Sequence, residues 1–153
     1  MTLSVSDDNL TNIVNILSEG WDTSNVAKPV VKRVMDTASP MTKDLQQADF
    51  ILVYPVNYTE EYIDLGAYNT KNVTRISIDI RTIRGIDRLR DLHKECRRCL
   101  WEKRINPVDD SNVRFPFHYI VPLSGNDLSD KMKPLYRFVY DVELREMVLK
   151  VTT

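Results

Sequence analysis

The chain is poor in the residue types from which compact chemical sites are often built. Its 153 residues include only four glycines, two cysteines and two histidines. The glycines are isolated, so the sequence lacks a glycine-rich loop of the kind that holds phosphates. It also lacks a G-x-S-x-G motif, and nothing supports a Ser-His-Asp triad. These absences favour a protein that binds over one that catalyses.

Charge excess and long hydrophobic runs are missing as well. Lys and Arg number 21 against 22 Asp and Glu, which gives a net charge of −1 at pH 7. A dedicated nucleic-acid-binding protein usually shows a strong basic excess or a basic face. No apolar run approaches the roughly 18 residues of a membrane-spanning helix, and the N-terminal stretch lacks the pattern of a signal peptide. We therefore expect no membrane partner, no cofactor, and reduced cysteines in a cytoplasm-like compartment.

What is present is an ordinary globular composition, with 42 % hydrophobic and 28 % charged residues. The length suits one domain over 1–153. A helix is expected from a cap at Ser6 or Asp7 to Gly20, and a second over 86–104. Apolar spacing predicts strands at 30–34, 50–56, 73–83, 117–122 and 135–148. The order α-β-β-β-α-β-β predicts an α+β fold of two layers, in which an antiparallel or mixed β-sheet has two helices on one face.

Three segments are predicted to be connections. Residues 57–71 form a long link that is rich in tyrosine and acid and is not a tight hairpin turn. Residues 37–48 form a polar connection, and 123–134 a loop. Because 21–47 show little pattern, the pairing of the first strand stays open.

Two of the predicted strands carry rows of charge of both signs. In "NVTRISIDIRT" (72–82) and in "YRFVYDVELRE" (136–146), charged and apolar residues alternate. Side chains alternate across a strand, so the apolar residues should meet the helices and the charges should lie on the far face. The charged side chains of the two rows are Arg75, Asp79, Arg81, Arg137, Asp141, Glu143 and Arg145.

These rows allow an alternative function, a small metal-dependent nuclease or RNA-binding module with a ferredoxin-like sheet. If the two strands were neighbours, Asp79, Asp141 and Glu143 could bind Mg²⁺. The arginines of the rows can instead pair with those acids across strands. The stretch "RFVY" (137–140) is similar to the aromatic strand on which RNA-recognition domains stack bases. Its apolar continuation to Leu144 is more typical of a core.

A C-x-x-C pair, Cys96 and Cys99, follows His93 in the second predicted helix. Such spacing could serve redox chemistry or zinc. The pair lies in mid-helix beside Leu92 and Leu100, where thiols usually belong to the core. We therefore expect two core thiols and no metal site.

Three stretches carry a resemblance to a known family. They are "ADFILVYPVNYTEEYIDLGAYNTKNVTRISIDIRT" (48–82), the helix "GIDRLRDLHKECRRCLWE" (85–102) and "YRFVYDVELRE" (136–146). Together they resemble the tail terminator (tail completion) proteins of long-tailed bacteriophages and archaeal tailed viruses, the group typified by the minor tail protein U of lambda-like phages. As a pattern, the resemblance covers about residues 8–150.

The resemblance implies a non-enzymatic structural protein of the virion tail and neck, assembled in the host cytoplasm. Such proteins form a homohexameric ring that caps the tail tube, stops its polymerisation and joins the tail to the head. The implied partners are other copies of the chain, the tail tube protein, the neck (stopper) protein and, in a contractile tail, a sheath or sheath-terminal component. DNA only passes through the ring.

The charged rows would then help neighbouring subunits recognise one another. A ring needs a heterologous interface that closes, and complementary polar groups give such an interface its register and specificity. The 57–71 link is the preferred partner contact, because tyrosine is favoured at interfaces. Its candidate contact residues are Tyr58, Glu60, Glu61, Tyr62, Asp64 and Tyr68.

Overall fold

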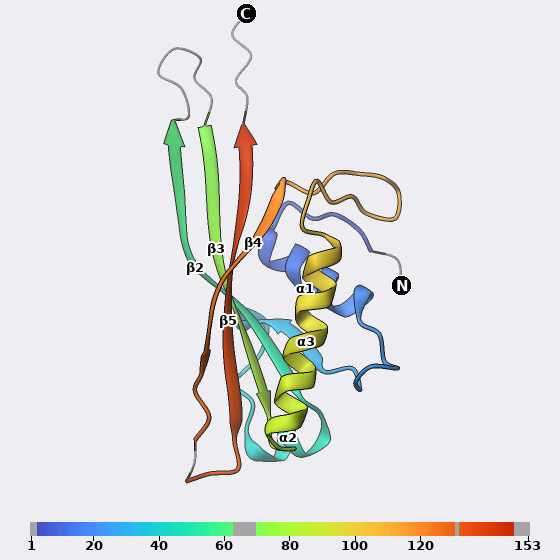
Figure 1. Cartoon of the computed structure of the whole chain (residues 1–153), viewed down its shortest axis with the longest axis vertical. Helices are drawn as coiled ribbons and strands as arrows, with labels where there is room; N and C mark the ends of the chain where they lie inside the picture. The colour runs from blue at the N-terminus through green and yellow to red at the C-terminus, as the bar shows by residue number, and fades with distance from the viewer. Residues whose placement is uncertain (1–2, 63–69, 131, 149–153) are drawn as a thin grey trace, which may run out of the picture.

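The computed structural model describes residues 3–62, 70–130 and 132–148, and it is an α+β fold built on one mixed sheet. The elements are α1 (Asn9–Gly20), β1 (Val30–Arg33), the 3-10 turn η1 (Val34–Asp36), α2 (Thr42–Gln47), β2 (Phe50–Tyr62), β3 (Thr70–Thr82), α3 (Ile86–Glu102), β4 (Tyr119–Asp127) and β5 (Tyr136–Val148). The predicted class and mixed sheet are confirmed. The predicted order and two-layer arrangement are matched only in part, because α2 adds a third helix at one end of the sheet (Figure 1).

The five strands lie in the order β1-β2-β3-β5-β4. β1 runs parallel to β2, with Val30 opposite Phe50, and every other pair is antiparallel. This resolves the pairing of the first strand. A parallel neighbour requires a crossover connection, which η1 and α2 supply between β1 and β2.

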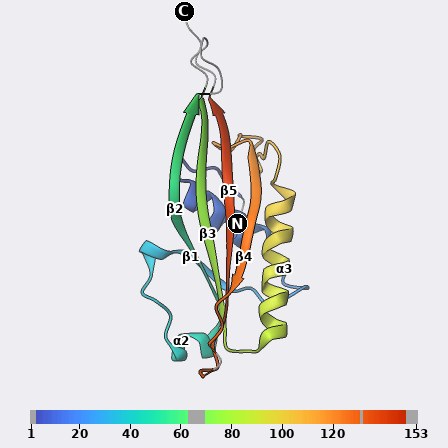
Figure 2. The same ribbon diagram turned by 60° about the vertical axis from the view of Figure 1, so that its left-hand side comes forward.

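The helices α1 and α3 pack on one face of the sheet, and α3 runs alongside β4 (Figure 2). The alternation expected in β3 is confirmed, since Ile76, Ile78 and Ile80 are fully buried beneath the helices. The helices contribute a matching set of buried side chains: Leu10, Ile13, Ile16, Leu17, Leu89, Leu92, Cys96, Cys99 and Leu100.

Local capping explains where the two longer helices begin. The N-cap of α1 is Asp8 and not the predicted Ser6 or Asp7, and its carboxylate accepts a hydrogen bond from the Leu10 amide at 3.1 Å. α3 begins after Gly85, whose φ of 105° suits glycine better than any residue with a side chain. None of the helices in the described ranges is long and apolar enough to cross a membrane.

Each of the three predicted connections contains regular structure. Residues 57–62 and 70–71 belong to β2 and β3, residues 42–47 form α2, and 123–127 belong to β4. The β2 prediction ended too early because of Pro55, which has no amide to donate to a ladder. The register shifts between Pro55 and Asn57. A β-bulge at Val56 therefore accommodates the proline, and the strand continues beyond it.

The ends of β2, β3 and β5 rise beyond the helices as a three-stranded extension (Figure 1). We call residues 57–62, 70–75 and 143–148 the arm. Cross-strand hydrogen bonds hold the arm together. Its base is buried at Leu144, where β4 pairs with β5, but its outer end extends beyond the helices. The arm exposes charged side chains and also large hydrophobic ones, among them Tyr58, Met147 and Val148.

A buried carboxylate on α3 fixes the loop that follows α1. Glu95 is 3 % exposed. It accepts hydrogen bonds from the Asp22 amide at 3.1 Å, from the Asn25 side chain at 2.9 Å and from Arg98 Nε at 2.8 Å. Burial raises the pKa of Glu95, but these hydrogen bonds more than offset it, so the net pKa is lower than usual. The folded protein therefore favours the charged carboxylate.

We expect Glu95→Gln to lower the free energy of unfolding by about 1–3 kcal/mol at pH 7, the usual range for hydrogen bonds to a charged group. A carboxyl whose pKa is lowered on folding adds stability above its ordinary pKa of 4.5, and this stability is lost as the pH falls through the lower folded value. Urea unfolding of both proteins should thus show a difference that shrinks below pH 4.5. Glu102→Gln is the control, because Glu102 pairs with the same arginine but is 59 % exposed. A pH-independent difference for Glu95→Gln would contradict this expectation.

Candidate functional site

The structure brings the two predicted charged rows onto one surface. β3 and β5 are neighbours, with Arg75 opposite Glu143, Ser77 opposite Asp141 and Arg81 opposite Arg137. Isoleucines of β3 face the helices, so this surface lies on the far side of the sheet. We call it the charged sheet face. Its row residues from the sequence prediction are Arg75, Asp79, Arg81, Arg137, Asp141, Glu143 and Arg145.

Asp79 lies at the centre of this face and is held by two arginines. Arg137 Nε lies 2.9 Å from Asp79 Oδ1, and Arg137 Nη2 lies 2.8 Å from Oδ2. Arg81 Nη2 also reaches Oδ2, at 2.9 Å. The Asp79 side chain is only 2 % exposed, and its hydrogen bonds raise the pKa of Arg137. This is a bidentate ion pair shielded by the side chains around it.

The other two acids of the rows are also engaged within the chain. Glu143 pairs with Arg145 at 2.9 Å and with Arg75 at 3.3 Å. Burial raises the pKa of Glu143, but the hydrogen bonds from these arginines lower it below its usual value. Asp141 accepts a hydrogen bond from the Ser77 hydroxyl. The charges of the face are thus largely compensated by one another, as cross-strand pairing predicted.

The arrangement of these acids does not support the hypothesis of a metal-dependent nuclease. Asp79 and Glu143 each already bind two arginine side chains, which compete with any cation for their oxygens. In the part of the chain that the structure describes, no three His, Cys, Asp or Glu side chains gather in a way that could hold a metal ion.

The aromatic strand is turned away from the charged sheet face. Tyr136, Phe138 and Tyr140 point toward the helices, where the first two are partly buried and Tyr140 is 8 % exposed. The ring of His93 on α3 lies 4.4 Å from Phe138 and 4.9 Å from Tyr140. The prediction that these aromatic residues belong to the core is confirmed. Their rings are therefore not exposed on a sheet surface where RNA bases could stack.

The C-x-x-C thiols also belong to the core. Both are free and buried, and burial raises their pKa values, that of Cys99 to about 12. A reactive thiol needs a lowered pKa. Burial likewise lowers the pKa of His93, with a further contribution from the charge of Arg97.

The predicted contact residues of the 57–71 segment are distributed over the arm. The bulge at Val56 determines which side of the sheet each later side chain of β2 occupies. Tyr58 and Glu60 lie on the helix side of the arm, and Glu61 lies on the opposite side. The Tyr58 hydroxyl donates a hydrogen bond to Glu60 at 2.7 Å. Tyr62 ends β2. Asp64 and Tyr68 lie outside the described residues.

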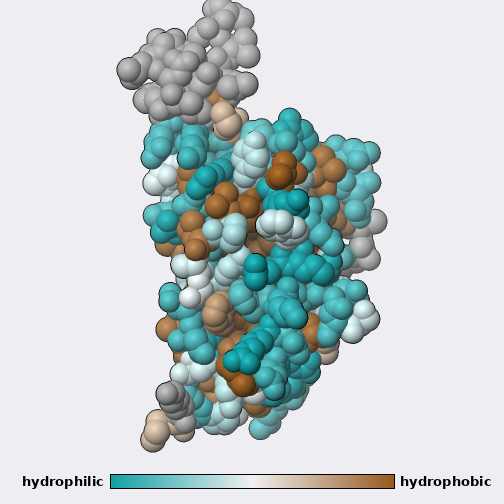
Figure 3. Space-filling view, viewed as in Figure 1, coloured by the Kyte–Doolittle hydropathy of each residue, from teal (hydrophilic) through white to brown (hydrophobic). Residues whose placement is uncertain are grey.

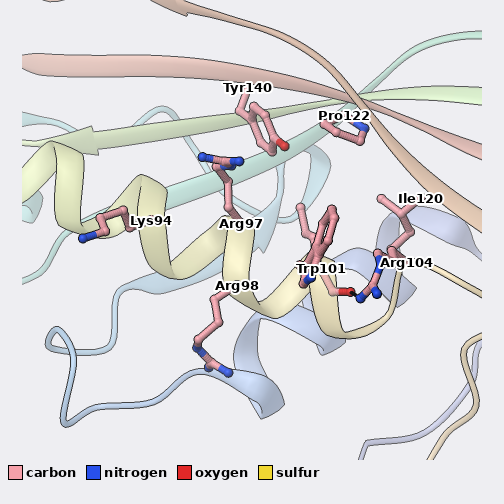
Figure 4. Close-up of a pocket in the computed structure, with 9 residues that line it drawn as sticks. Lys94, Arg97, Arg98, Trp101, Arg104, Ile120, Pro122 and Tyr140 are labelled. Carbon is pink, nitrogen blue, oxygen red and sulfur yellow. Dashed lines mark hydrogen bonds between the residues drawn. The ribbon is translucent and has the colours of Figure 1, made fainter.

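A hollow lies between α3 and β4, and the sequence reasoning missed it. It has a volume of about 300 Å³ and is lined mainly by side chains of α3, β4 and β5 (Figure 4). We call it the groove. It was recognisable in part from a basic and aromatic series at helical spacing, which comprises Lys94, Arg97, Trp101 and Arg104.

The groove combines an apolar floor with a cationic rim. Leu100 and Ile120 are buried at its base, whereas Trp101 is 60 % exposed. Arg104 stacks over the Trp101 ring with its Cζ 4.1 Å from the ring centroid. Arg97 reaches toward Tyr140 from the same helix face (Figure 4). The face of the molecule that carries α3 accordingly mixes hydrophobic and strongly hydrophilic surface (Figure 3).

Comparison of the chain with models of protein families and with curated proteins finds no match. What the chain does is therefore inferred from its own residues and their arrangement.

Proposed function

We propose that the chain is a structural virion protein, copies of which form a homohexameric ring that caps the tail tube. The ring stops tube polymerisation and joins the tail to the neck, with DNA passing through it. Its partners are the tail tube protein, the neck protein and, in a contractile tail, a sheath component. The resemblance of residues 48–82, 85–102 and 136–146 supports this proposal, as does an α+β fold with a single sheet.

The single observation that carries the proposal is the partly uncovered arm. Its strands continue past the helices (Figure 1), so its outer end is open, whereas Leu144 at its base is 1 % exposed and belongs to the core. Tyr58 is 55 % exposed there and Met147 45 %. These two side chains lie on opposite faces of the arm, and tyrosine and methionine are both enriched at protein interfaces. Neighbouring subunits or tail proteins would cover them.

The charged sheet face supports the same proposal in a different way. Because its arginines are paired with Asp79 and Glu143, few cations remain to attract phosphates. Weak phosphate attraction is what a DNA passage requires, since each cationic contact adds to the affinity for the backbone. Such a face is also suited to specific docking by polar pairing.

The test is a mass measurement on the purified chain, alone and mixed with tail tubes. We expect a six-chain species, formed spontaneously or on tube ends, and tubes that no longer elongate. Electron microscopy of the mixture would show rings at tube termini. A chain that stays monomeric at all salt concentrations and leaves tube growth unchanged would refute the proposal.

A further inference from the structure

We infer that the groove between α3 and β4 is the receptor for the arm of a neighbouring copy of the chain. This inference rests on the proposed ring and names the surfaces by which its subunits join. The groove supplies cations and an open tryptophan, and the arm supplies carboxylates and a tyrosine.

Three of the four cations that line the groove have no carboxylate partner within the described chain. Lys94 and Arg97 are exposed and Arg104 is half-buried, yet none of the three has an ion pair, in contrast to Arg98 on the same helix, which pairs with Glu95 and Glu102. Arg98 also borders the groove, but its guanidinium is held by these two carboxylates, whereas Arg97 reaches toward Tyr140 (Figure 4). The rim therefore presents positive charge that an acidic partner can neutralise.

The apolar part of the groove favours an aromatic residue within that acidic partner. Trp101 forms an exposed flat wall beside Ile120, which is 6 % exposed, and Pro122. Aromatic side chains pack against such walls in offset or edge-to-face geometry. Tyrosine, tryptophan and arginine are the residues that most often dominate the binding energy of interfaces.

The helix-side surface of the arm has the complementary chemistry. Glu60 and Glu146 both lie opposite Asn72, one on each side of it, so two carboxylates flank the middle strand. Tyr58 lies beside them and is hydrogen-bonded to Glu60. That bond, together with the nearby charges, raises the pKa of Tyr58 to about 12. The arm therefore offers two negative charges and a neutral phenol on one surface.

The arm and the groove are two different surfaces of one chain, so they can join successive copies around a ring. In the proposed ring the contact between arm and groove is heterologous, because each copy uses one surface toward one neighbour and the other surface toward the next. Heterologous contacts generate a closed ring when the rotation between copies closes. Two arms, or two grooves, would bring like charges together, which disfavours a dimer that pairs arm with arm or groove with groove.

Charge reversal on each surface, alone and combined, tests the inference. We expect Lys94→Glu/Arg97→Glu and Glu60→Lys/Glu146→Lys each to convert the six-chain species to monomers, and the combination of all four to restore assembly at least in part. Native mass spectrometry reports the species, and circular dichroism confirms folding of each variant. The matched controls are Glu61→Lys on the opposite face of the arm and Arg90→Glu on α3 outside the groove, which should assemble as the wild type does.

Trp101 supplies a direct signal for arm binding. Its emission should shift to shorter wavelength when the wild-type chain assembles, and Trp101→Phe should remove that shift, because the other tryptophan, Trp21, is already buried at 8 % exposure. An unchanged emission spectrum in an assembled wild-type ring would overturn the inference.

The outcomes separate this inference from the proposed function. A wild-type chain that never assembles and ignores tail tubes refutes the ring itself. Wild-type rings together with unimpaired rings in both charge-reversed variants refute the arm–groove contact and leave the ring intact. Groove variants that form rings but no longer cap tubes would also overturn the inference, since they would assign the groove to the tube protein.

Discussion

Replacing Asp79 with alanine is expected to lower the free energy of unfolding by about 3 kcal/mol, the lower end of the range for breaking a buried ion pair. Asp79 is 1 % exposed although it lies on the face of the sheet without helices. Its removal leaves Arg137 and Arg81 close together, because the two are direct cross-strand partners. Their partial exposure, 30 % and 16 % at the side chains, keeps the loss from being larger. Chemical unfolding measures the change.

Two comparisons make the Asp79 result specific. Asp87→Ala removes a carboxylate from a largely exposed pair with Arg90, so a change in stability below about 1 kcal/mol is expected. Asp79→Val combined with Arg137→Leu should recover part of the loss, because Leu52 and Val139 flank position 79 in the sheet and can pack against apolar replacements. Equal small effects for Asp79→Ala and Asp87→Ala would show that the central ion pair is not structural.

Replacing Gly125 with alanine is expected to destabilise the fold by about 1–3 kcal/mol, the usual cost of overpacking. A Cβ at this position would lie 2.6 Å from Phe138 Cε1 and closer still to Cζ. Retreat of the ring is opposed on one side by His93, whose ring centroid lies 4.4 Å from that of Phe138. Strand β4 is at the sheet edge, so part of the strain can be relieved by an outward shift of that strand. Thermal unfolding of the variant would show a lowered midpoint.

The Phe138 ring should account for most of that loss. In a Phe138→Leu background, we expect Gly125→Ala to cost much less than in the wild type, which is a non-additive effect typical of residues in contact. The neighbouring substitution Ser124→Ala is the control, because this side chain is exposed. A fully additive pair would show that the glycine is needed for a reason other than close approach of the ring.

Part of the proposed interface could be predicted from the local spacing of residues. The strands with rows of charge were predictable from alternation alone, since side chains with a period of two must divide between a buried and an open face. The core stripe of α3 followed in the same way from helical spacing. The basic and aromatic series from Lys94 to Arg104 was equally visible in the sequence, but it forms one wall of a groove only because β4 lies beside it.

Other features depend on contacts between residues far apart in the chain. Pro55 suggested the end of a strand, yet pairing with β3 carries β2 past it by means of a bulge at Val56. That bulge decides that Glu60 and Glu61 face opposite sides. Likewise, the arginines of the charged face were predicted to find acids, but the choice of Asp79 as the shared partner of Arg81 and Arg137 required the β3–β5 register.

The amino-acid order alone established the α+β class, the apolar faces of the long strands and helices, the core position of the two thiols and the mixed charge of the open face, because each of these depends on residues close together in the chain. The tertiary structure decided the parallel pairing of β1 with β2, the reach of the arm and the assembly of the groove from α3 and β4. Those features depend on which strands become neighbours and in what register. That choice minimises the free energy of the whole sheet and is not encoded in any single segment.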